Sequence, residues 1–304
     1  MVTKKAELLL YLYAESPVHA GASDALDVID LPVQREASTT YPVIWGQSLK
    51  GALRQAAGDA GWDHTTVKTV FGREIDDAAA GELESGLLSV GDAQLVAMPV
   101  PTLRRTFAWV TSQLALSRLA RKYTFAGHRV PGQPTVADDR GLAADAKWIS
   151  PGGQVLGPCV LPLEDTVSPE LRSWAELLAH DAIGAGPGLA DFGAKLETDL
   201  LLVGSDAMPM LLRECTELTP RVQLNEGKTV KHGPFYSEYL PTETILVAAL
   251  TLRAGVKAAA TEFDEHLKAV RDLLGDKPNL LQVGGDETLG KGLVWTRLVE
   301  AVRE

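Results

Sequence analysis

The sequence is poor in several features that would decide its class at once. Its 304 residues include only two cysteines, Cys159 and Cys215, whose spacing matches no metal knuckle or redox motif. The longest apolar runs, such as residues 8–14, fall far short of the roughly 20 residues that span a bilayer. A lysine pair precedes that run as in a signal peptide, but Glu7 interrupts it and no small-residue cleavage pattern follows. A soluble cytoplasmic protein with no membrane partner is expected.

An excess of basic residues is also missing. The sequence has 29 Lys and Arg and 40 Asp and Glu, which gives a formal net charge of −11. Nucleic-acid-binding domains are usually basic, although a local basic strip can bind phosphates while the rest of the surface stays acidic. The remaining composition, 45% hydrophobic and 23% charged, is globular and excludes a coiled coil, a collagen-like fibre and a disordered chain. The length predicts one or two domains.

Strand-like and helix-like segments alternate along the chain. We expect strands near residues 8–14, 87–100, 200–203, 244–252 and 293–298, helices near 48–60, 110–122, 171–182 and 263–274, and a β-hairpin over 221–230. Ser48 is expected to cap the first helix and Gly61 to end it. Long excursions, at 19–40 and 127–157, do not suit a doubly wound sheet. An α+β fold fits better: a ferredoxin-like βαββαβ core with large insertions.

The segment from Gly285 to Gly292 nearly matches a phosphate-binding loop. Gly292 stands where the magnesium-binding hydroxyl belongs, and a strand rather than a helix is expected next. The pattern therefore argues against hydrolysis of a nucleoside triphosphate. Two interpretations stay open: a glycine-rich turn that approaches a phosphate chain, or a plain turn between two strands.

Two cations share one polar face of the first expected helix. Lys50 and Arg54 lie four residues apart. Lys50 is expected in the first turn, where a cation opposes the helix dipole unless an anion binds there. The alternative is an ordinary solvated helix face.

An acidic loop precedes that helix. Asp24, Asp27 and Asp30 recur every three residues and could hold Mg²⁺ or act as general acid or base, or they form a solvated loop. His19 lies beside them, and a lone histidine is more often a packing residue than a catalyst. No G-x-S-x-G elbow, Cys/His pair or His-x-x-x-His pair supports other catalytic classes.

Several of these segments together resemble one family. Residues 28–36 (VIDLPVQRE) and 41–54 (YPVIWGQSLKGALR) are similar to the backbone subunits of type III-B (Cmr) CRISPR effector complexes, members of the RAMP superfamily. The likeness continues over residues 89–93, 107–111 and 284–292, and so runs nearly from end to end.

The resemblance implies an architecture and an activity. It implies one RAMP-type domain over residues 1–304, with a ferredoxin-like, RRM-related palm, finger-forming insertions and a β-hairpin thumb at about 217–241. Copies of such subunits stack along a CRISPR RNA with other Cmr subunits. Each thumb opens the guide–target duplex, and the target single-stranded RNA is cut at regular intervals with Mg²⁺ or another divalent cation.

The resemblance also implies roles for particular residues. Asp30 matches the cleavage aspartate, which would also contact the metal. His19, which matches a family histidine before the loop, and Glu238, in the stretch that matches a secondary catalytic region, are the other catalytic candidates. The RNA-binding positions are Gln47, Ser48, Lys50, Arg54, Arg221, Gly284, Gly285, Gly290, Lys291 and Gly292. One alternative is a scaffold subunit that binds CRISPR RNA without cutting. Another is a metal-free endoribonuclease that matures CRISPR RNA, for which only His19 is offered.

Overall fold

The computed structural model describes residues 4–22, 29–73, 85–255, 260–275 and 279–300. Its strands are β1 Lys5–Ala14, β2 Val43–Ile44, β3 Leu88–Val90, β4 Ala93–Pro101, β5 Phe107–Thr111, β6 Gly141–Ala143, β7 Gln154–Leu156, β8 Cys159–Leu161, β9 Leu200–Val203, β10 Glu217–Leu224, β11 Val230–Tyr239, β12 Ile245–Arg253, β13 Asn279–Gln282 and β14 Leu293–Glu300. Its helices are α1 Gly46–Asp59, α2 His64–Phe71, α3 Gln113–Phe125, α4 Pro169–Leu178, α5 Leu189–Asp199, α6 Met208–Glu214 and α7 Ala260–Leu274. Short 3₁₀ turns lie at η2 Ala146–Trp148 and η4 Glu287–Leu289, and a π-helical turn η3 at Ala179–Ile183.

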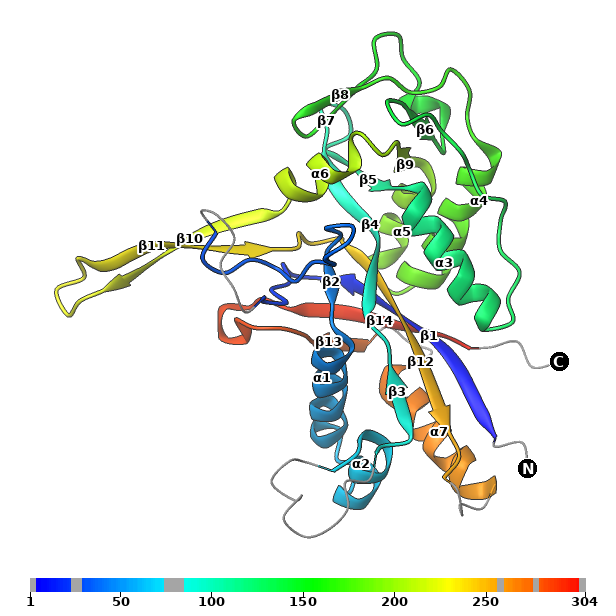
Figure 1. The fold of residues 1–304 in the computed structure, drawn as a ribbon, viewed down its shortest axis with the longest axis vertical. Helices are drawn as coiled ribbons and strands as arrows, with labels where there is room; N and C mark the ends of the chain where they lie inside the picture. The colour runs from blue at the N-terminus through cyan, green and yellow to red at the C-terminus, as the bar shows by residue number, and fades with distance from the viewer. Residues whose placement is uncertain (1–3, 23–28, 74–84, 256–259, 276–278, 301–304) are drawn as a thin grey trace.

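One large sheet organises the molecule (Figure 1). Its strand order is β13-β14-β1-β12-β4-β5-β9-β6, with β2 paired to β4 and β3 paired to β12. All the pairings are antiparallel except β5 with β9, so the sheet is mixed. The fold is therefore α+β, as the sequence predicts.

Both faces of the sheet are covered, which explains why β1 is apolar without alternation. Leu8, Leu10 and Leu12 pack on one face against α1, α2 and α7. Leu9, Tyr11 and Tyr13 pack on the other face against α3, α4 and α5. Figure 1 shows these two groups of helices on opposite sides of the central strands. A strand that is buried on both faces needs apolar side chains at every position.

The β10–β11 hairpin projects from the body of the molecule (Figure 1). Its far half is exposed on both strands, whereas Ser237, Glu238 and Tyr239 are buried where β11 enters the fold. The hairpin predicted over 221–230 is confirmed and extends over 217–239. Only its base is anchored in the core, so its tip is free to reach a partner.

Two predictions about where helices begin are wrong. The helix expected from residue 110 begins at Gln113, because Val110 and Thr111 complete β5 and Ser112 caps α3 by accepting from the Ala115 N–H. Ser48 does not cap α1, which begins two residues earlier at Gly46 with Trp45 at its N-cap. Gly61, with φ +80°, does follow the helix end as predicted.

No helix among the described residues combines the length and the apolar character that a bilayer span requires.

Candidate RNA-processing site

Asp30 lies on a loop that runs along the base of the hairpin. This Asp30 loop, residues 29–42, pairs with β11 through two backbone hydrogen bonds. The Leu31 N–H donates to the Tyr236 carbonyl at 3.1 Å, and the Glu238 N–H donates to the Leu31 carbonyl at 2.9 Å. The Tyr236 N–H donates to Asp30 Oδ2 at 2.7 Å. The exposed Asp30 carboxylate is thus fixed by one oxygen, and the other oxygen has no described partner.

The other two aspartates of the acidic loop, Asp24 and Asp27, lie outside the described residues.

Glu238 is buried beneath this loop and both of its oxygens are occupied. Its side chain is 1% exposed. The Val33 N–H donates to Oε2 at 3.0 Å, and the Arg35 guanidinium pairs with Oε1 at 2.5 Å. Hydrogen bonds from a guanidinium and a backbone N–H are the contacts that a buried carboxyl group needs in place of water. Glu238 therefore connects β11 to the Asp30 loop and presents no free oxygen to solvent.

His19 is also a buried member of this region. Its Nδ1–H donates to the Glu238 carbonyl at 2.7 Å, and its ring packs on Tyr239 with centroids 5.4 Å apart. Only 8% of the residue is exposed. The hydrogen bond to a carbonyl fixes the proton on Nδ1 when the imidazole is neutral.

The glycine-rich loop, residues 283–292, closes over His19. It joins β13 to β14, so a strand follows it as the sequence predicts, and the loop is a turn between two strands. The Gly285 N–H donates to the His19 carbonyl at 2.9 Å, and the Gly292 N–H donates to the Pro17 carbonyl at 2.9 Å. Gly284 has φ +83°, and a Cβ there would lie 2.3 Å from the His19 carbonyl oxygen. Glycine is therefore required at 284 by packing as well as by backbone conformation. Gly290 also has a positive φ, but a Cβ there would meet open space.

Four side chains clamp the hairpin to this loop. Arg221 pairs with Asp286, and the Tyr239 hydroxyl donates to Asp286 Oδ2 at 2.8 Å. The Lys291 ammonium lies 5.1 Å from the centre of the Tyr239 ring, within cation–π range. Arg221 and Lys291 thus both contact Tyr239, although 70 residues separate them in sequence.

Helix α1 places the two predicted cations differently from expectation. Lys50 is the fifth residue of the helix, so it lies in the second turn rather than the first. The helix N-terminus already has an anion, because the Gly46 N–H donates to Asp92 Oδ1 at 2.7 Å. Partial burial and the neighbouring Arg54 charge lower the pKa of Lys50. Arg54 donates to the Gly72 carbonyl at the end of α2.

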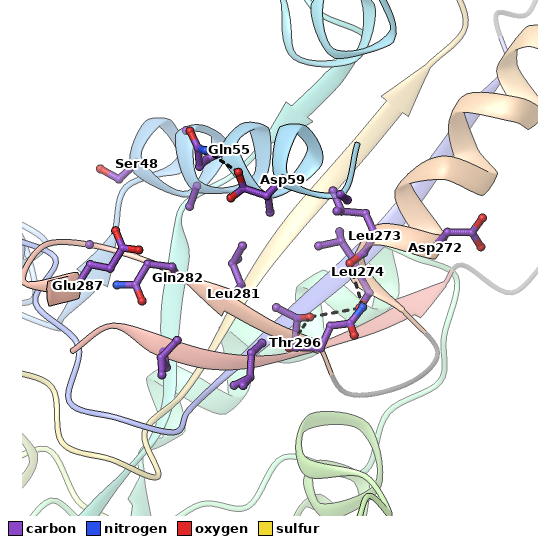
Figure 2. A pocket seen from close by; sticks show the side chains of 18 of the residues that line it. Ser48, Gln55, Asp59, Asp272, Leu273, Leu274, Leu281, Gln282, Glu287 and Thr296 are labelled. Atoms are coloured by element: carbon purple, nitrogen blue, oxygen red, sulfur yellow. Dashed lines mark hydrogen bonds between the residues drawn. The ribbon is translucent and has the colours of Figure 1, made fainter. Parts of the chain in front are cut away.

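A cavity of about 810 Å³ lies between α1, β13 and the end of α7 (Figure 2). We call it the α1–β13 groove. Gln47, Ser48 and Gly284 line its end near the glycine-rich loop, with Glu287 beside them. Asp59 and Asp272 line the rest, with residues 279–282 of β13. None of the lining residues that the structure describes is a lysine or arginine. Lys50 and Arg54 do not face it.

A profile of a known family matches residues 11–295, nearly the whole of this chain. The chain belongs to the RAMP superfamily. The family resemblance seen in the sequence is thereby confirmed.

Individual relatives of this RAMP chain are similar over their full lengths. The CRISPR system Cmr endoribonuclease Cmr4 of Pyrococcus furiosus is 30% identical over 305 residues, covering 96% of this chain and 95% of the relative. A crystal structure of oligomeric Cmr4 from the same organism superposes with a TM-score of 0.75 at 27% identity, covering 98% of this chain and 99% of the other. A cryo-EM structure of type III-B Cmr-beta bound to cognate target RNA has a TM-score of 0.69 at 18% identity over 97% of both chains, which shows the shared fold.

Sequence reasoning missed four residues that shape the site of this RAMP protein. Arg35 holds Glu238, Tyr236 holds Asp30 through its backbone, Asp92 binds the start of α1, and Asp286 holds Arg221. All four stand within or next to segments that carry the resemblance or the hairpin. No local pattern reveals their roles, because each acts on a partner at least 46 residues away.

The donor groups of this RAMP chain fit one mode of metal binding. No cluster of three or more His, Cys, Asp or Glu side chains that could hold an ion occurs among the residues described. Asp30 is a single exposed carboxylate with one oxygen free. Mg²⁺ often binds through one or two carboxylates, waters and substrate phosphates rather than through an all-protein cage. Asp30 fits this mode, in which one carboxylate and a substrate phosphate would share the ion.

Proposed function

We propose that this chain is a backbone subunit of a type III-B CRISPR effector complex that holds CRISPR RNA and cleaves complementary target RNA. The assignment rests on the full-length likeness to the Cmr endoribonuclease Cmr4. The observation that carries the cleavage activity is Asp30, an exposed carboxylate fixed at the base of a projecting hairpin. The hairpin would enter the guide–target duplex and leave a displaced target nucleotide beside Asp30.

Asp30 is the residue that would act on the target. Its oxygen Oδ2 is held by the Tyr236 N–H, and its free oxygen would face the ribose 2′-hydroxyl or a water on the scissile phosphate. A divalent cation shared between Asp30 and the RNA would stabilise the negative charge that develops on that phosphate. A displaced nucleotide leaves the stacked A-form geometry, which allows the 2′-oxygen to align with the adjacent phosphate.

Glu238 and His19 support Asp30 in this proposal rather than touch the RNA. Glu238 uses both carboxylate oxygens to hold the Asp30 loop, and His19 is buried against Glu238 and Tyr239. We therefore treat both as positioning residues. Their substitution would shift Asp30 relative to the hairpin.

The CRISPR RNA would run across the start of α1 and the glycine-rich loop. Gln47, Ser48 and Gly284 face a common space there. Lys50 and Arg54 lie on α1, Lys291 lies in the loop with Gly285, Gly290 and Gly292, and Arg221 pairs with Asp286 of the same loop. Backbone approach at glycines and scattered cations suit phosphate and ribose contacts, not base reading. Sequence would be read by pairing alone.

The strand order supports a ferredoxin-like palm within a single RAMP-type domain. Taking β1, β3, β12 and β14 as the four strands and α1 and α7 as the two crossings gives βαββαβ. Their order in the sheet is β14-β1-β12-β3, and α1 and α7 cover the same face. The segment from β4 to α6 would then be the finger-forming insertion and β10–β11 the thumb.

The decisive experiment uses the complex assembled with CRISPR RNA, a labelled complementary RNA, and Mg²⁺ or EDTA. Asp30→Asn keeps an oxygen to accept from the Tyr236 N–H but removes the charge. We expect regularly spaced, metal-dependent cuts that fall at least about 100-fold in Asp30→Asn, with target affinity within about twofold. Asp139→Asn, an exposed aspartate with no described side-chain partner, is the matched control.

The other outcomes are equally clear. Unchanged cutting by Asp30→Asn would place catalysis on another residue or subunit. Target binding by the wild type without any cutting would leave the chain as a scaffold. Glu238→Gln, measured alongside, should slow cutting while the metal concentration for half-maximal rate stays the same, because Glu238 does not contact the ion.

A further inference from the structure

The turn between β4 and β5 has an unfavourable backbone conformation. Residues 102–106 form this β4–β5 turn. Arg105 and Thr106 have φ of 62° and 71°, two successive non-glycine residues in the left-handed region. That region brings Cβ close to the following carbonyl oxygen, so such residues persist only where their surroundings hold them. A β-branched threonine is especially unsuited to it.

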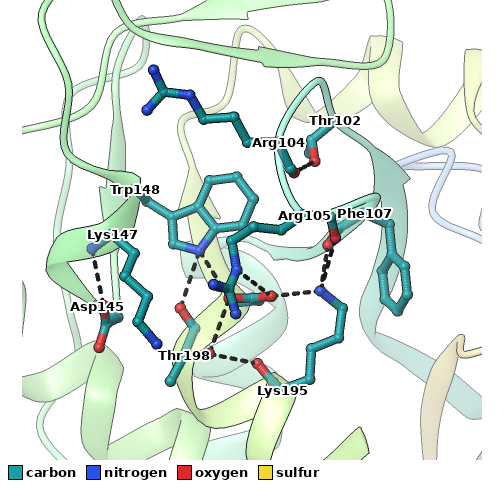
Figure 3. Close-up of polar contacts among 10 residues, drawn as sticks. Thr102, Arg104, Arg105, Phe107, Asp145, Lys147, Trp148, Lys195 and Thr198 are labelled. Atoms are coloured by element: carbon teal, nitrogen blue, oxygen red, sulfur yellow. Dashed lines mark hydrogen bonds and ion pairs between the residues drawn. The ribbon is translucent and has the colours of Figure 1, made fainter.

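A buried aspartate, Asp199, and a lysine, Lys195, hold the turn; Figure 3 shows the Lys195 side chain beside Arg105 and Phe107. Asp199 is 0% exposed and accepts from Arg105 Nε at 2.8 Å. Lys195 pairs with Asp199 at 2.5 Å and donates to the carbonyls of Arg105 at 3.1 Å and Phe107 at 2.9 Å. The Trp148 indole N–H donates to Asp199 Oδ1 at 3.2 Å. The turn is therefore a fixed structure rather than a loose tip.

This fixed turn presents an aliphatic side chain beside free cations. Leu103 is 83% exposed, the largest exposure of any large hydrophobic residue described. Arg104 follows it, and Lys147 lies on η2 next to Trp148, which contacts the same Asp199 that holds Arg105. Within the part of the chain that the structure describes, no ion pair involves the side chain of Arg104 or Lys147.

The chemistry of the turn favours a protein partner over RNA. An exposed leucine gains by burial against apolar surface and gains nothing from a phosphate chain. Single strands bind where bases stack on exposed rings, but Trp148 is only 1% exposed and Phe107 packs under the Lys195 ammonium. The partner should carry a groove with apolar walls and carboxylates.

This chain carries such a groove itself. Away from its glycine-rich end the α1–β13 groove is lined by Asp59 and Asp272 (Figure 2). Leu280 also lines it and is 49% exposed. The absence of cations among its described lining residues makes that part unsuited to RNA phosphates and complementary to Arg104 and Lys147.

We propose that the β4–β5 turn of one copy docks into the α1–β13 groove of the next copy. Leu103 packs against Leu280, and Arg104 pairs with Asp59 and Asp272. The turn and the groove are different surfaces, so the contact is heterologous and can repeat from copy to copy. The glycine-rich end of the groove stays free for the CRISPR RNA. The inference rests on the proposed function, in which copies of this chain associate along one RNA, and it assigns that association to these two surfaces.

The test measures self-association of the full-length chain by light scattering and sedimentation, with and without CRISPR RNA several subunits long. Arg104→Glu and Leu103→Asp should each weaken self-association at least tenfold, and Asp59→Arg should do the same. The double variant Arg104→Glu with Asp59→Arg should recover most of the loss, because it restores an opposite pair. Arg121→Glu, an exposed arginine on α3, makes the same charge change and should have no effect. Circular dichroism checks that each variant is folded.

Binding of a short RNA, long enough for one subunit, separates this inference from the proposed function. Wild-type affinity for that RNA in Arg104→Glu, together with lost self-association, supports the docking contact. Unchanged self-association in Arg104→Glu and Leu103→Asp overturns it while leaving RNA cleavage as proposed. Weaker binding of the short RNA by Arg104→Glu also overturns it, because the turn would then be an RNA contact.

Discussion

At the scale of single residues, the structure distinguishes side chains that can contact a ligand from side chains that only position other residues. Asp30 and Glu238 are both acidic and lie on paired segments, but only Asp30 is exposed with an oxygen free. Glu238 is enclosed by Arg35 and Val33. The difference is one of environment, since a buried polar group must be hydrogen-bonded within the protein whereas an exposed one can contact solvent or a ligand.

Glu243 is the residue whose ionisation should be visible in stability. Burial raises its pKa to about 7, and the Tyr13 hydroxyl donates to it. Between the ordinary carboxyl pKa of 4.5 and about 7, the folded chain binds the extra proton, so stability should fall as pH rises through this window. Because the side chain is partly exposed, we expect a loss of about 1–2 kcal/mol between pH 4.5 and pH 8.

Urea unfolding across that pH range tests this. Glu243→Gln should abolish this loss of stability, so the free energy of unfolding of the variant should rise relative to that of the wild type as pH rises. Glu197→Gln, an exposed glutamate, should leave the pH profile unchanged. A wild-type stability that rises through the window would contradict the buried-acid interpretation.

At the scale of elements, helix α1 depends on a partner far away in sequence. It has no side-chain cap of its own at Trp45. Asp92, in the connection between β3 and β4, accepts from the Gly46 N–H instead. A Cβ on Gly46 would lie 2.4 Å from the Val90 carbonyl oxygen, so glycine allows this close approach. The start of α1 is thus set by the sheet beside it.

Removing Asp92 should loosen the start of this helix. Asp92→Ala removes both the hydrogen bond and the negative charge at the helix N-terminus, and should lower the free energy of unfolding by about 1 kcal/mol. Asp92→Asn keeps an acceptor and should lose about half as much. Urea titrations of both variants measure the effect, with Asp139→Ala as control; equal stability of Asp92→Ala and wild type would contradict it.

At the scale of the whole molecule, a net charge of −11 is compatible with the proposed RNA binding because basic and acidic side chains lie on different parts of the surface. Arg221 and Lys291 lie at the hairpin base, and Lys50 and Arg54 lie on α1. Acidic side chains occupy the far part of the α1–β13 groove. Copies bound to one RNA would repel each other unless a basic surface of one copy contacts an acidic surface of the next.

Contacts through phosphate and ribose predict a particular binding behaviour. Two CRISPR RNAs of equal length and unrelated guide sequence should bind with dissociation constants within about twofold of each other. Affinity for both should fall as salt rises, because bound cations displace counterions from phosphates. Filter binding at several salt concentrations measures this. A strong preference for one guide would show base reading by the protein.

The sequence alone determined the elements whose cause is local. The apolar run of β1, the periodic apolar face of α1 and the turn at residues 225–227 each specify their own structure, and the blocks around Asp30 and Lys50 were enough to indicate the family. The start of α3 could not be predicted from the sequence, because Val110 and Thr111 belong to strand β5, whose neighbour β9 lies about 90 residues away in the chain.

Only the tertiary structure decided which of the candidate side chains are free. The sequence makes both Asp30 and Glu238 catalytic candidates, and the structure shows that Glu238 is buried against Arg35 and the Asp30 loop whereas Asp30 is exposed. Asp92 reaches Gly46, Asp286 reaches Arg221, and Asp199 reaches Arg105 across 46 to 94 residues. Hydrogen bonds and ion pairs depend on distance in space, and folding of the sheet sets those distances, so no local pattern could reveal them.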